Sequence, residues 1–223
     1  MTATGLGFAY QSSSAILDGL DLSVPAGSSA AVMAPSGVGK TTLLMVLGGL
    51  RRAQAGEVVI VDETSDDTAR SGRPRPRVAW VFQAMHLIGG RTAVDNVAIA
   101  VLSGGMPRPR AEALARHALE RFGVGELADR PVRSLSGGQC QRVALARAAV
   151  AEPLVVLADE PTANLDQDNA AAVAQVLVRG FPRSAVLIAT HDATVARQTD
   201  RVWYLDHGRL RPVTLDGVDD AVA

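Results

Sequence analysis

The stretch Ala30-Ala-Val-Met-Ala-Pro-Ser-Gly-Val-Gly-Lys-Thr-Thr42 joins a short apolar run to an apolar helical pattern through a glycine-rich turn. It therefore predicts a strand, a loop and a helix in that order. Gly37 and Gly39 would let backbone N–H groups come close to a polyphosphate, and the start of the helix adds its dipole. In such a loop Lys40 reaches the β and γ phosphates, and the Thr41 hydroxyl is a magnesium ligand.

Ala34 departs from the phosphate-loop pattern G-x-x-x-x-G-K-[ST], which has glycine at this position. If the position requires a positive φ, alanine weakens ligand binding; if it does not, the methyl group is tolerated. The sequence leaves both open. A plain glycine-rich turn before a helix would also contain these residues.

Short apolar or β-branched runs along the rest of the chain predict strands at residues 57–61, 77–82, 154–158, 185–189 and 202–205. Helical patterns lie between them, at residues 41–50, 94–102, 110–122, 137–150, 169–178 and 193–198. In the third of these, one face is predicted to be buried; it holds Ala111, Leu114, Ala115, Ala118, Leu119 and Phe122. Strands that alternate with helices favour a mainly parallel α/β sheet covered on both faces.

The alternation breaks at residues 85–152, where helical patterns occur without a convincing strand. We interpret this segment as a helical insert between two parts of the core, residues 1–84 and 153–211. Residues 62–76 are polar and proline-rich, which predicts an exposed loop, and residues 212–223 form a short tail. The whole chain is expected to be one domain.

Composition narrows the function classes. The chain has 223 residues, of which 48% are hydrophobic, enough for one sizeable core. Its 22 basic and 23 acidic side chains give a net charge of -1, so no nucleic-acid partner is expected. One cysteine excludes an intrachain disulfide and favours a reducing compartment, and no apolar run approaches the roughly 18 residues that span a bilayer. A cytoplasmic location is expected.

The stretch Leu154-Val-Val-Leu-Ala-Asp-Glu-Pro161 brings two carboxylates to the end of an apolar strand. Ligands of α/β sheets bind at that end. Asp159 is a candidate magnesium ligand, and Glu160 a candidate general base that orients the water attacking the γ-phosphate. The alternative is a buried strand that ends in solvated charges. The phosphate loop upstream favours the functional interpretation.

Leu135-Ser-Gly-Gly-Gln139 stands immediately before a helical pattern. Ser136 and the N–H groups of Gly137 and Gly138 can form a second anion site at a helix start, although an ordinary helix cap would contain the same residues. This stretch is identified as the signature motif of the ABC ATPase family, and the family's other motifs follow in order from Tyr10 to His191.

The resemblance implies a P-loop NTPase (RecA-like) core, an N-terminal antiparallel β part and an inserted α-helical subdomain. It implies ATP and Mg²⁺ as ligands, and a head-to-tail dimer in which each signature motif closes on the ATP of the other subunit. It assigns ATP contacts to Tyr10, Ser36, Gly37, Val38, Gly39, Lys40, Thr41 and Thr42. It assigns contacts with the opposite subunit's ATP to Ser136, Gly137, Gly138 and Gln139.

The same resemblance gives specific roles to Tyr10 and to three residues outside the phosphate loop and the signature motif. Tyr10 resembles the aromatic residue that stacks on adenine, and the alternative is a tyrosine packed on the sheet. Gln83 resembles the Q-loop glutamine of the magnesium and water site, or else is a polar strand end. Asp166 resembles the D-loop aspartate at the dimer seam, or else caps a helix. His191 resembles the switch histidine that contacts the γ-phosphate and positions Glu160, or else is a structural histidine after a strand.

The compact single cassette and the stretch Ala158-Asp-Glu-Pro-Thr-Ala-Asn-Leu-Asp166 look most like the group that serves lipoprotein release, macrolide or peptide export and cell division. The resemblance then implies an integral membrane permease as partner, docked at residues 84–96, and a peripheral place on the inner face of the cell membrane. Met85, Leu87 and Ile88 are expected to be exposed there.

Several alternatives stay open. The chain could be an importer ATPase, or an ATP-dependent regulatory module with little turnover. Its dimer could be a homodimer, which the intact motifs permit, or a heterodimer. Cys140 could be a thiol sensor or a small packing residue.

Overall fold

The computed structural model describes residues 1–10, 14–62 and 78–218, and its centre is a six-stranded sheet. The strand order is β5-β6-β7-β3-β8-β9. The strands are β3 (Ser29–Met33), β5 (Val78–Val81), β6 (Val155–Asp159), β7 (Ala185–Thr190), β8 (Arg201–Asp206) and β9 (Arg209–Val213). All neighbours pair in parallel except β9, which is antiparallel to β8. Strands β3 and β7 are buried along their whole length, as expected of a sheet covered on both faces.

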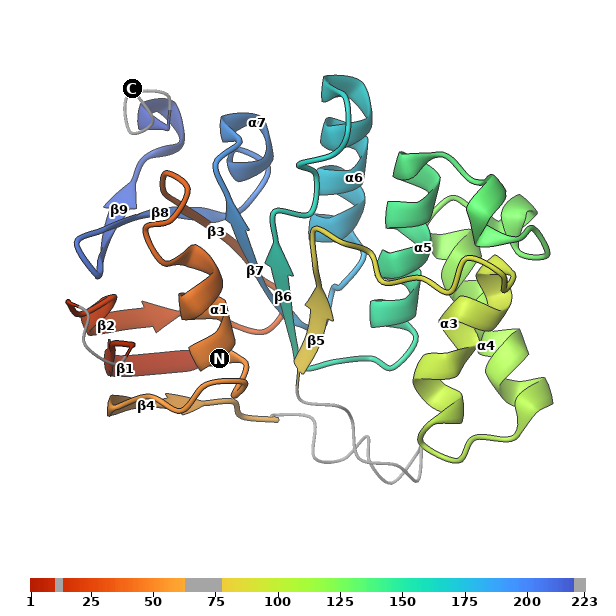
Figure 1. Cartoon of the computed structure of the whole chain (residues 1–223), viewed down its shortest axis with the longest axis horizontal. Helices are drawn as coiled ribbons and strands as arrows, with labels where there is room; N and C mark the ends of the chain where they lie inside the picture. Colours follow the sequence, from red (N-terminus) through yellow and green to blue (C-terminus); the bar gives the residue numbers. More distant parts are fainter. Residues whose placement is uncertain (11–13, 63–77, 219–223) are drawn as a thin grey trace.

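A second, antiparallel sheet has the order β2-β1-β4, with β1 (Thr2–Phe8), β2 (Leu17–Ser23) and β4 (Ala55–Val59). The turn between β8 and β9 joins it to the central sheet, because the Gly208 carbonyl accepts a hydrogen bond of 2.9 Å from the Asp18 amide. Helix α1 (Lys40–Leu47) packs in the same hydrophobic cluster as this sheet and one face of the central sheet. Figure 1 shows α1 beside the β1-β2-β4 layer.

The helical insert lies at the other end of the molecule (Figure 1) and contains α3 (Ala93–Leu102), α4 (Arg108–Arg121) and α5 (Gly137–Ala149). Its apolar faces share one hydrophobic cluster with β5, β6 and α6 (Gln167–Arg179). Among the described residues, the other helices are α7 (Ala193–Ala196) and the 3-10 turns Gly125–Leu127, Val132–Ser134 and Leu215–Gly217. The predicted α/β fold with a parallel core, an N-terminal antiparallel part and a helical insert is confirmed.

The element boundaries differ from the sequence prediction in a few places. Helix α1 ends at Leu47, three residues earlier than predicted, because Gly48 and Gly49 end it and Gly49 has a φ of 74°. The predicted buried face of α4 holds except at Leu114, which lies at the edge of the apolar stripe and is 37% exposed. Strand β9 extends to Val213 and so includes the first two residues of the predicted tail. The predicted loop at 62–76 lies almost entirely outside the described residues.

Strands β1 and β2 were not predicted as individual elements. Glycines at positions 5, 7 and 19 interrupt the alternation of apolar residues, and the β1–β2 pairing has two register shifts. In the part of the chain that the structure describes, no helix combines the length and the apolar character needed to cross a membrane.

Candidate active site

The loop between β3 and α1 forms a cradle with an open cavity of about 280 Å³. Gly37 and Gly39 have φ values of 84° and 122°, which only glycine adopts without strain. A Cβ atom on Gly39 would lie 2.5 Å from Ile16 Cγ2, so this position also lacks room for a side chain. The cavity is lined by Ser36, Gly37, Gly39, Lys40, Thr41, Thr42, Asp159 and Glu160. Val38 instead packs against the neighbouring hydrophobic cluster.

Ala34 fits the cradle without backbone strain. It is 3% exposed, and the described non-glycine residues with positive φ are His86, Glu152, Glu160 and His207, so Ala34 is not one of them. Its carbonyl accepts a hydrogen bond of 2.5 Å from Lys40 Nζ. The position therefore requires no glycine for its φ, and its methyl group is part of the core.

Lys40 and two carboxylates meet at the floor of the cavity. Lys40 is 7% exposed, and its Nζ lies 3.3 Å from Glu160 Oε1. The Thr41 hydroxyl donates a 2.7 Å hydrogen bond to Asp159 Oδ2. Burial raises the pKa of Asp159 above its usual value, and the Glu160 charge adds to this effect, while the Thr41 hydrogen bond and Lys40 oppose it. A nearby cation would stabilise the ionised form of Asp159.

The residues around Asp159 fit a magnesium ion. Asp159 Oδ1 is buried and has no hydrogen-bond partner, while its other oxygen contacts the Thr41 hydroxyl. Hard divalent cations prefer carboxylate and hydroxyl oxygens of this kind. An unpartnered buried carboxylate oxygen is costly unless a ligand satisfies it.

Glu160 and His191 meet because β6 and β7 are parallel neighbours that end at the same edge. Asp159 pairs with Ala189, and the Glu160 amide donates to the Ala189 carbonyl at 2.9 Å. His191 Nδ1 lies 3.0 Å from Glu160 Oε1. Glu160 has a φ of 44°, a left-handed conformation that is uncommon for a residue with a side chain. Backbone strain of this kind often accompanies functional positions.

Tyr10 and Gln83 lie at the margins of the cradle. The Tyr10 hydroxyl is 3.4 Å from Thr42 Oγ1, and its ring, which meets Phe8 edge to face, is part of a side chain that is 41% exposed. Gln83 is exposed and follows β5, whose Val81 pairs with Ala158 of β6, so it lies at the same sheet edge as Asp159. Gln83 does not line the cavity.

The signature turn, residues 135–139, lies outside this cavity. Ser136 is the N-cap of α5: its Oγ accepts from the Gln139 amide at 3.3 Å, and Gln139 Oε1 accepts from the Ser136 amide at 3.0 Å. Ser136 and Gly137 are exposed, whereas Gly138 is buried. The chain therefore brings Lys40, Thr41, Asp159, Glu160 and His191 together but keeps the signature turn apart from them.

Asp166 belongs to a segment that packs directly on the signature turn. It is the N-cap of α6 and accepts hydrogen bonds from the Asn169 amide at 2.9 Å and Asn169 Nδ2 at 2.7 Å. These bonds hold the pKa of Asp166 below its usual value. A Cβ atom on Gly138 would lie 3.1 Å from Asn169 Oδ1, and one on Gly137 would lie 3.4 Å from Leu165 Cδ2. The two glycines allow this close contact.

The loop between β5 and α3 (residues 82–92, the β5–α3 loop) differs from expectation in its exposure. Ile88 is 48% exposed, but Met85 and Leu87 are half-buried, and Leu87 packs against the core of the insert. Sequence reasoning also missed two residues that hold this loop, Arg147 and Asn96. The only signal in the sequence was a polar side chain within an otherwise apolar helical pattern, which is not specific.

Cys140 has the environment of a packing residue. Its thiol is half-buried and lies 3.5 Å from the Val132 carbonyl, and burial raises its pKa above the usual value. A raised pKa reduces the thiolate fraction on which reactivity depends.

Comparison with known proteins agrees with this geometry. A protein-family profile described as "ABC transporter" matches residues 17–163. The "Lipoprotein-releasing system ATP-binding protein LolD" of Chromohalobacter salexigens is 42% identical over 200 residues, covering 87% of this chain and 84% of the relative. The predicted similarity to the lipoprotein-release group is therefore confirmed.

Two solved structures are similar over nearly the whole chain. One is cbiO1 from Clostridium perfringens, described as part of the ABC transporter complex cbiONQ, with a TM-score of 0.83, 26% identity, and coverage of 98% of this chain and 90% of that one. The other is a dimeric post-hydrolysis state of the ATP-binding cassette MJ0796 bound to ADP and Pi, with a TM-score of 0.75, 30% identity, and coverage of 96% and 98%.

Proposed function

Since this chain belongs to the ABC transporter family and is one of its ATP-hydrolysing subunits, we propose that it closes as a dimer around two ATP molecules and so drives a separate integral membrane permease. The observation that carries the proposal is the contact of Glu160 with both Lys40 and His191 at the edge of an open phosphate cradle. A carboxylate held there can orient a water molecule towards the terminal phosphate.

Each cradle residue has a role in binding ATP or in the reaction. The N–H groups of residues 36–42 surround the phosphates, Lys40 neutralises their charge, and the Tyr10 ring stacks on adenine. Glu160 orients and deprotonates the attacking water, and His191 holds Glu160 in place through the 3.0 Å contact. Thr41, Asp159 and Gln83 would hold a magnesium ion, which neutralises charge on the β and γ phosphates when bound.

A second copy would complete the site. The signature turn is exposed and lies away from the cradle of its own chain. In a head-to-tail homodimer, Ser136, Gly137, Gly138 and Gln139 of each chain would close on the ATP held by the other. Asp166 would lie at the seam, and its packing beside the signature turn supports this position. The dimeric relative that holds ADP and Pi supports the same arrangement.

The membrane partner would dock on residues 84–96, at the start of the helical insert (residues 85–152), with the chain peripheral on the inner face of the membrane. The exposed side chain of Ile88 supports this surface. The β5–α3 loop also supports it, because this loop connects the central sheet to the helical insert. The relatives named as lipoprotein-releasing ATP-binding proteins support an export or mechanotransmission system that acts on lipoproteins.

The decisive experiment compares the parent chain with Glu160→Gln in the presence of ATP and magnesium. We expect ATP-dependent dimers of the variant, detected by light scattering, to persist while phosphate release falls by about 100-fold or more. Equal phosphate release by the two proteins would remove Glu160 from the mechanism. Dimers without measurable phosphate release by the parent would instead favour a regulatory module with little turnover.

A further inference from the structure

Arg147 holds the backbone of the β5–α3 loop. Its Nη1 donates to the His86 carbonyl at 2.8 Å and its Nη2 to the Met85 carbonyl at 2.8 Å. The side chain is half-buried and, within the described residues, forms no ion pair. A guanidinium that meets two successive carbonyls with two parallel N–H groups fixes both the position and the direction of that backbone.

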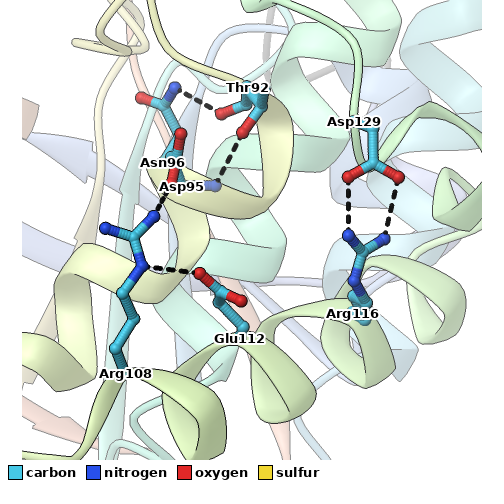
Figure 2. A network of polar contacts seen from close by, with 7 residues as sticks. All are labelled: Thr92, Asp95, Asn96, Arg108, Glu112, Arg116 and Asp129. Carbon is cyan, nitrogen blue, oxygen red and sulfur yellow. Dashed lines mark hydrogen bonds and ion pairs between the residues drawn. The ribbon is translucent and has the colours of Figure 1, made fainter.

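Asn96 holds the same loop further along the chain, at Ile88 and Thr92. It is 1% exposed; its Oδ1 accepts from the Ile88 amide at 2.7 Å, and its Nδ2 donates to the carbonyls of Ile88 at 3.1 Å and Thr92 at 2.9 Å. Figure 2 shows Asn96 turned towards Thr92, apart from the exposed Arg116–Asp129 pair. The loop is therefore anchored to α5 at one end and to α3 at the other.

The Arg147 end of the loop has an unusual backbone. His86 has a φ of 47°, and its ring meets Phe82 edge to face at 5.6 Å. Phe82 in turn stacks on Trp80 of β5, with ring centroids 5.3 Å apart. A left-handed residue with a side chain persists only where its surroundings hold it, and the bond from Arg147 to the His86 carbonyl is such a restraint.

The helix that carries Arg147 is also the helix that begins at the signature turn. Ser136 caps α5, and Arg147 lies about 16 Å along it at 1.5 Å per residue. A continuous α-helix moves as one body, so a displacement of the β5–α3 loop that pulls on Arg147 also moves Ser136. At the same end as Ser136, α5 contacts the Asp166 segment through Gly138 and Asn169.

We infer that Arg147 is a positioning residue that sets the orientation of the signature turn according to the position of the β5–α3 loop. The inference rests on the proposed function, in which this loop receives the membrane partner and Ser136 closes on the ATP of a second copy. A partner that presses on exposed Ile88 would thus change the alignment of Ser136 without touching the cradle.

The test uses the full chain with Glu160→Gln, so that ATP-bound dimers accumulate. Into it we would introduce Arg147→Leu, Arg147→Lys and, as a matched control, Arg116→Leu, which removes an exposed arginine of the same insert that pairs with Asp129. Two quantities are measured for each protein: the affinity of the dilute monomer for a fluorescent ATP analogue, and the ATP concentration that gives half-maximal dimer by light scattering.

Arg147→Leu should raise the ATP concentration for half-maximal dimer by about tenfold, because both bonds to the loop are lost. Arg147→Lys should give a smaller increase, since an ammonium keeps the charge but lacks the two-pronged geometry. Monomer affinity should be unchanged in both, and Arg116→Leu should match the parent in both measurements. Amide hydrogen exchange should be faster at residues 85–88 in the Arg147 variants alone.

Other outcomes are distinguishable. Dimerisation of Arg147→Leu at the parent's ATP concentration would overturn the inference, as would a loss of monomer affinity in Arg147→Lys that matches the loss of dimer. If Arg147→Leu fails to fold, Arg147→Lys decides: faster loop exchange with unchanged dimerisation contradicts the inference. A Glu160→Gln parent that never dimerises would instead contradict the proposed function.

Discussion

The cradle and the signature turn are both helix starts suited to anions, but they are stabilised in different ways. In the cradle, buried Lys40 contacts Glu160, and Thr41 contacts Asp159, so charged groups are brought together before any ligand binds. In the signature turn, exposed Ser136 satisfies the first turn of its own helix through the bonds with Gln139. Under the proposed function, the cradle would bind ATP within one chain, whereas the signature turn would meet an ATP molecule held by another chain.

Lys40→Ala should have the largest effect and should damage the cradle alone. Without the Lys40 ammonium, no side-chain cation among the described residues of this site offsets the negative charges of Glu160, Asp159 and a bound phosphate. We expect phosphate release to fall by about 1000-fold and binding of a fluorescent ATP analogue to the dilute monomer to be lost as well. Nearly normal ATP affinity in a folded Lys40→Ala protein would show that the backbone N–H groups alone hold the phosphates.

Ser136→Ala tests the other side of the comparison. We expect phosphate release to fall by about 30-fold to 100-fold because an anion contact across the dimer is lost. The affinity of the dilute monomer for ATP should stay unchanged, since Ser136 lies outside the cradle cavity.

A matched control separates this effect from loss of the helix cap. Thr214 is the N-cap of the 3-10 turn Leu215–Gly217, and its side chain accepts from the Gly217 amide at 3.2 Å, much as Ser136 does for Gln139. Thr214→Ala should cost up to about 1 kcal/mol of stability, as loss of a cap does, while its phosphate release stays normal. Equal loss of activity in both variants would mean that Ser136 acts only as a cap.

The sequence predicted the cradle better than it predicted the insert, for a physical reason. The cradle depends on local backbone geometry. The spacing of Gly37, Gly39 and Lys40 therefore indicates both a turn from strand to helix and a phosphate-containing ligand. The apolar ends of β6 and β7 likewise predict where Asp159, Glu160 and His191 emerge, because parallel strands end at one edge.

The contacts within the insert depend on tertiary packing between distant segments. Arg147 meets carbonyls 61 and 62 residues away, and backbone carbonyls leave no mark in a sequence. For the same reason the sequence predicted Leu87 as exposed, although it packs on the core of the insert. Strands β1 and β2 were missed individually because their glycines obscure the period of two.

Tyr10 offers a test of the margin of the cradle. Tyr10→Ala should weaken monomer ATP binding by about tenfold, as the loss of one base-stacking ring does, and Tyr10→Phe should keep most of the affinity. The hydroxyl contact with Thr42, at 3.4 Å, is too long to contribute much. Similar losses in both variants would give that contact, rather than stacking, the larger role. Titration with a fluorescent ATP analogue measures both.

The smallest effects should have opposite signs in the two regions, and they concern stability without nucleotide. Burial raises the pKa of Asp159 in the folded state above the unfolded value of 3.8, so folding disfavours the charged carboxylate. The folded state therefore loses stability as pH rises from 3.8 to the raised pKa. Asp159→Asn should therefore raise Tm at pH 7, by roughly 2 °C after allowance for partial solvent exposure. The gain should vanish below about pH 3, where both states of the parent are protonated.

Asp166 at the start of α6 should behave in the opposite way. Hydrogen bonds from Asn169 lower its folded-state pKa below 3.8, so the stability from its charge is present above that value and is lost as pH falls through the lowered one. Asp166→Asn should then lower Tm at pH 7, and the deficit should disappear in acid. Thermal unfolding from pH 3 to 7 measures both variants. If both variants change Tm in the same direction at pH 7, the charge of Asp159 does not destabilise the folded cradle. A ligand would then have no unfavourable carboxylate charge to offset there.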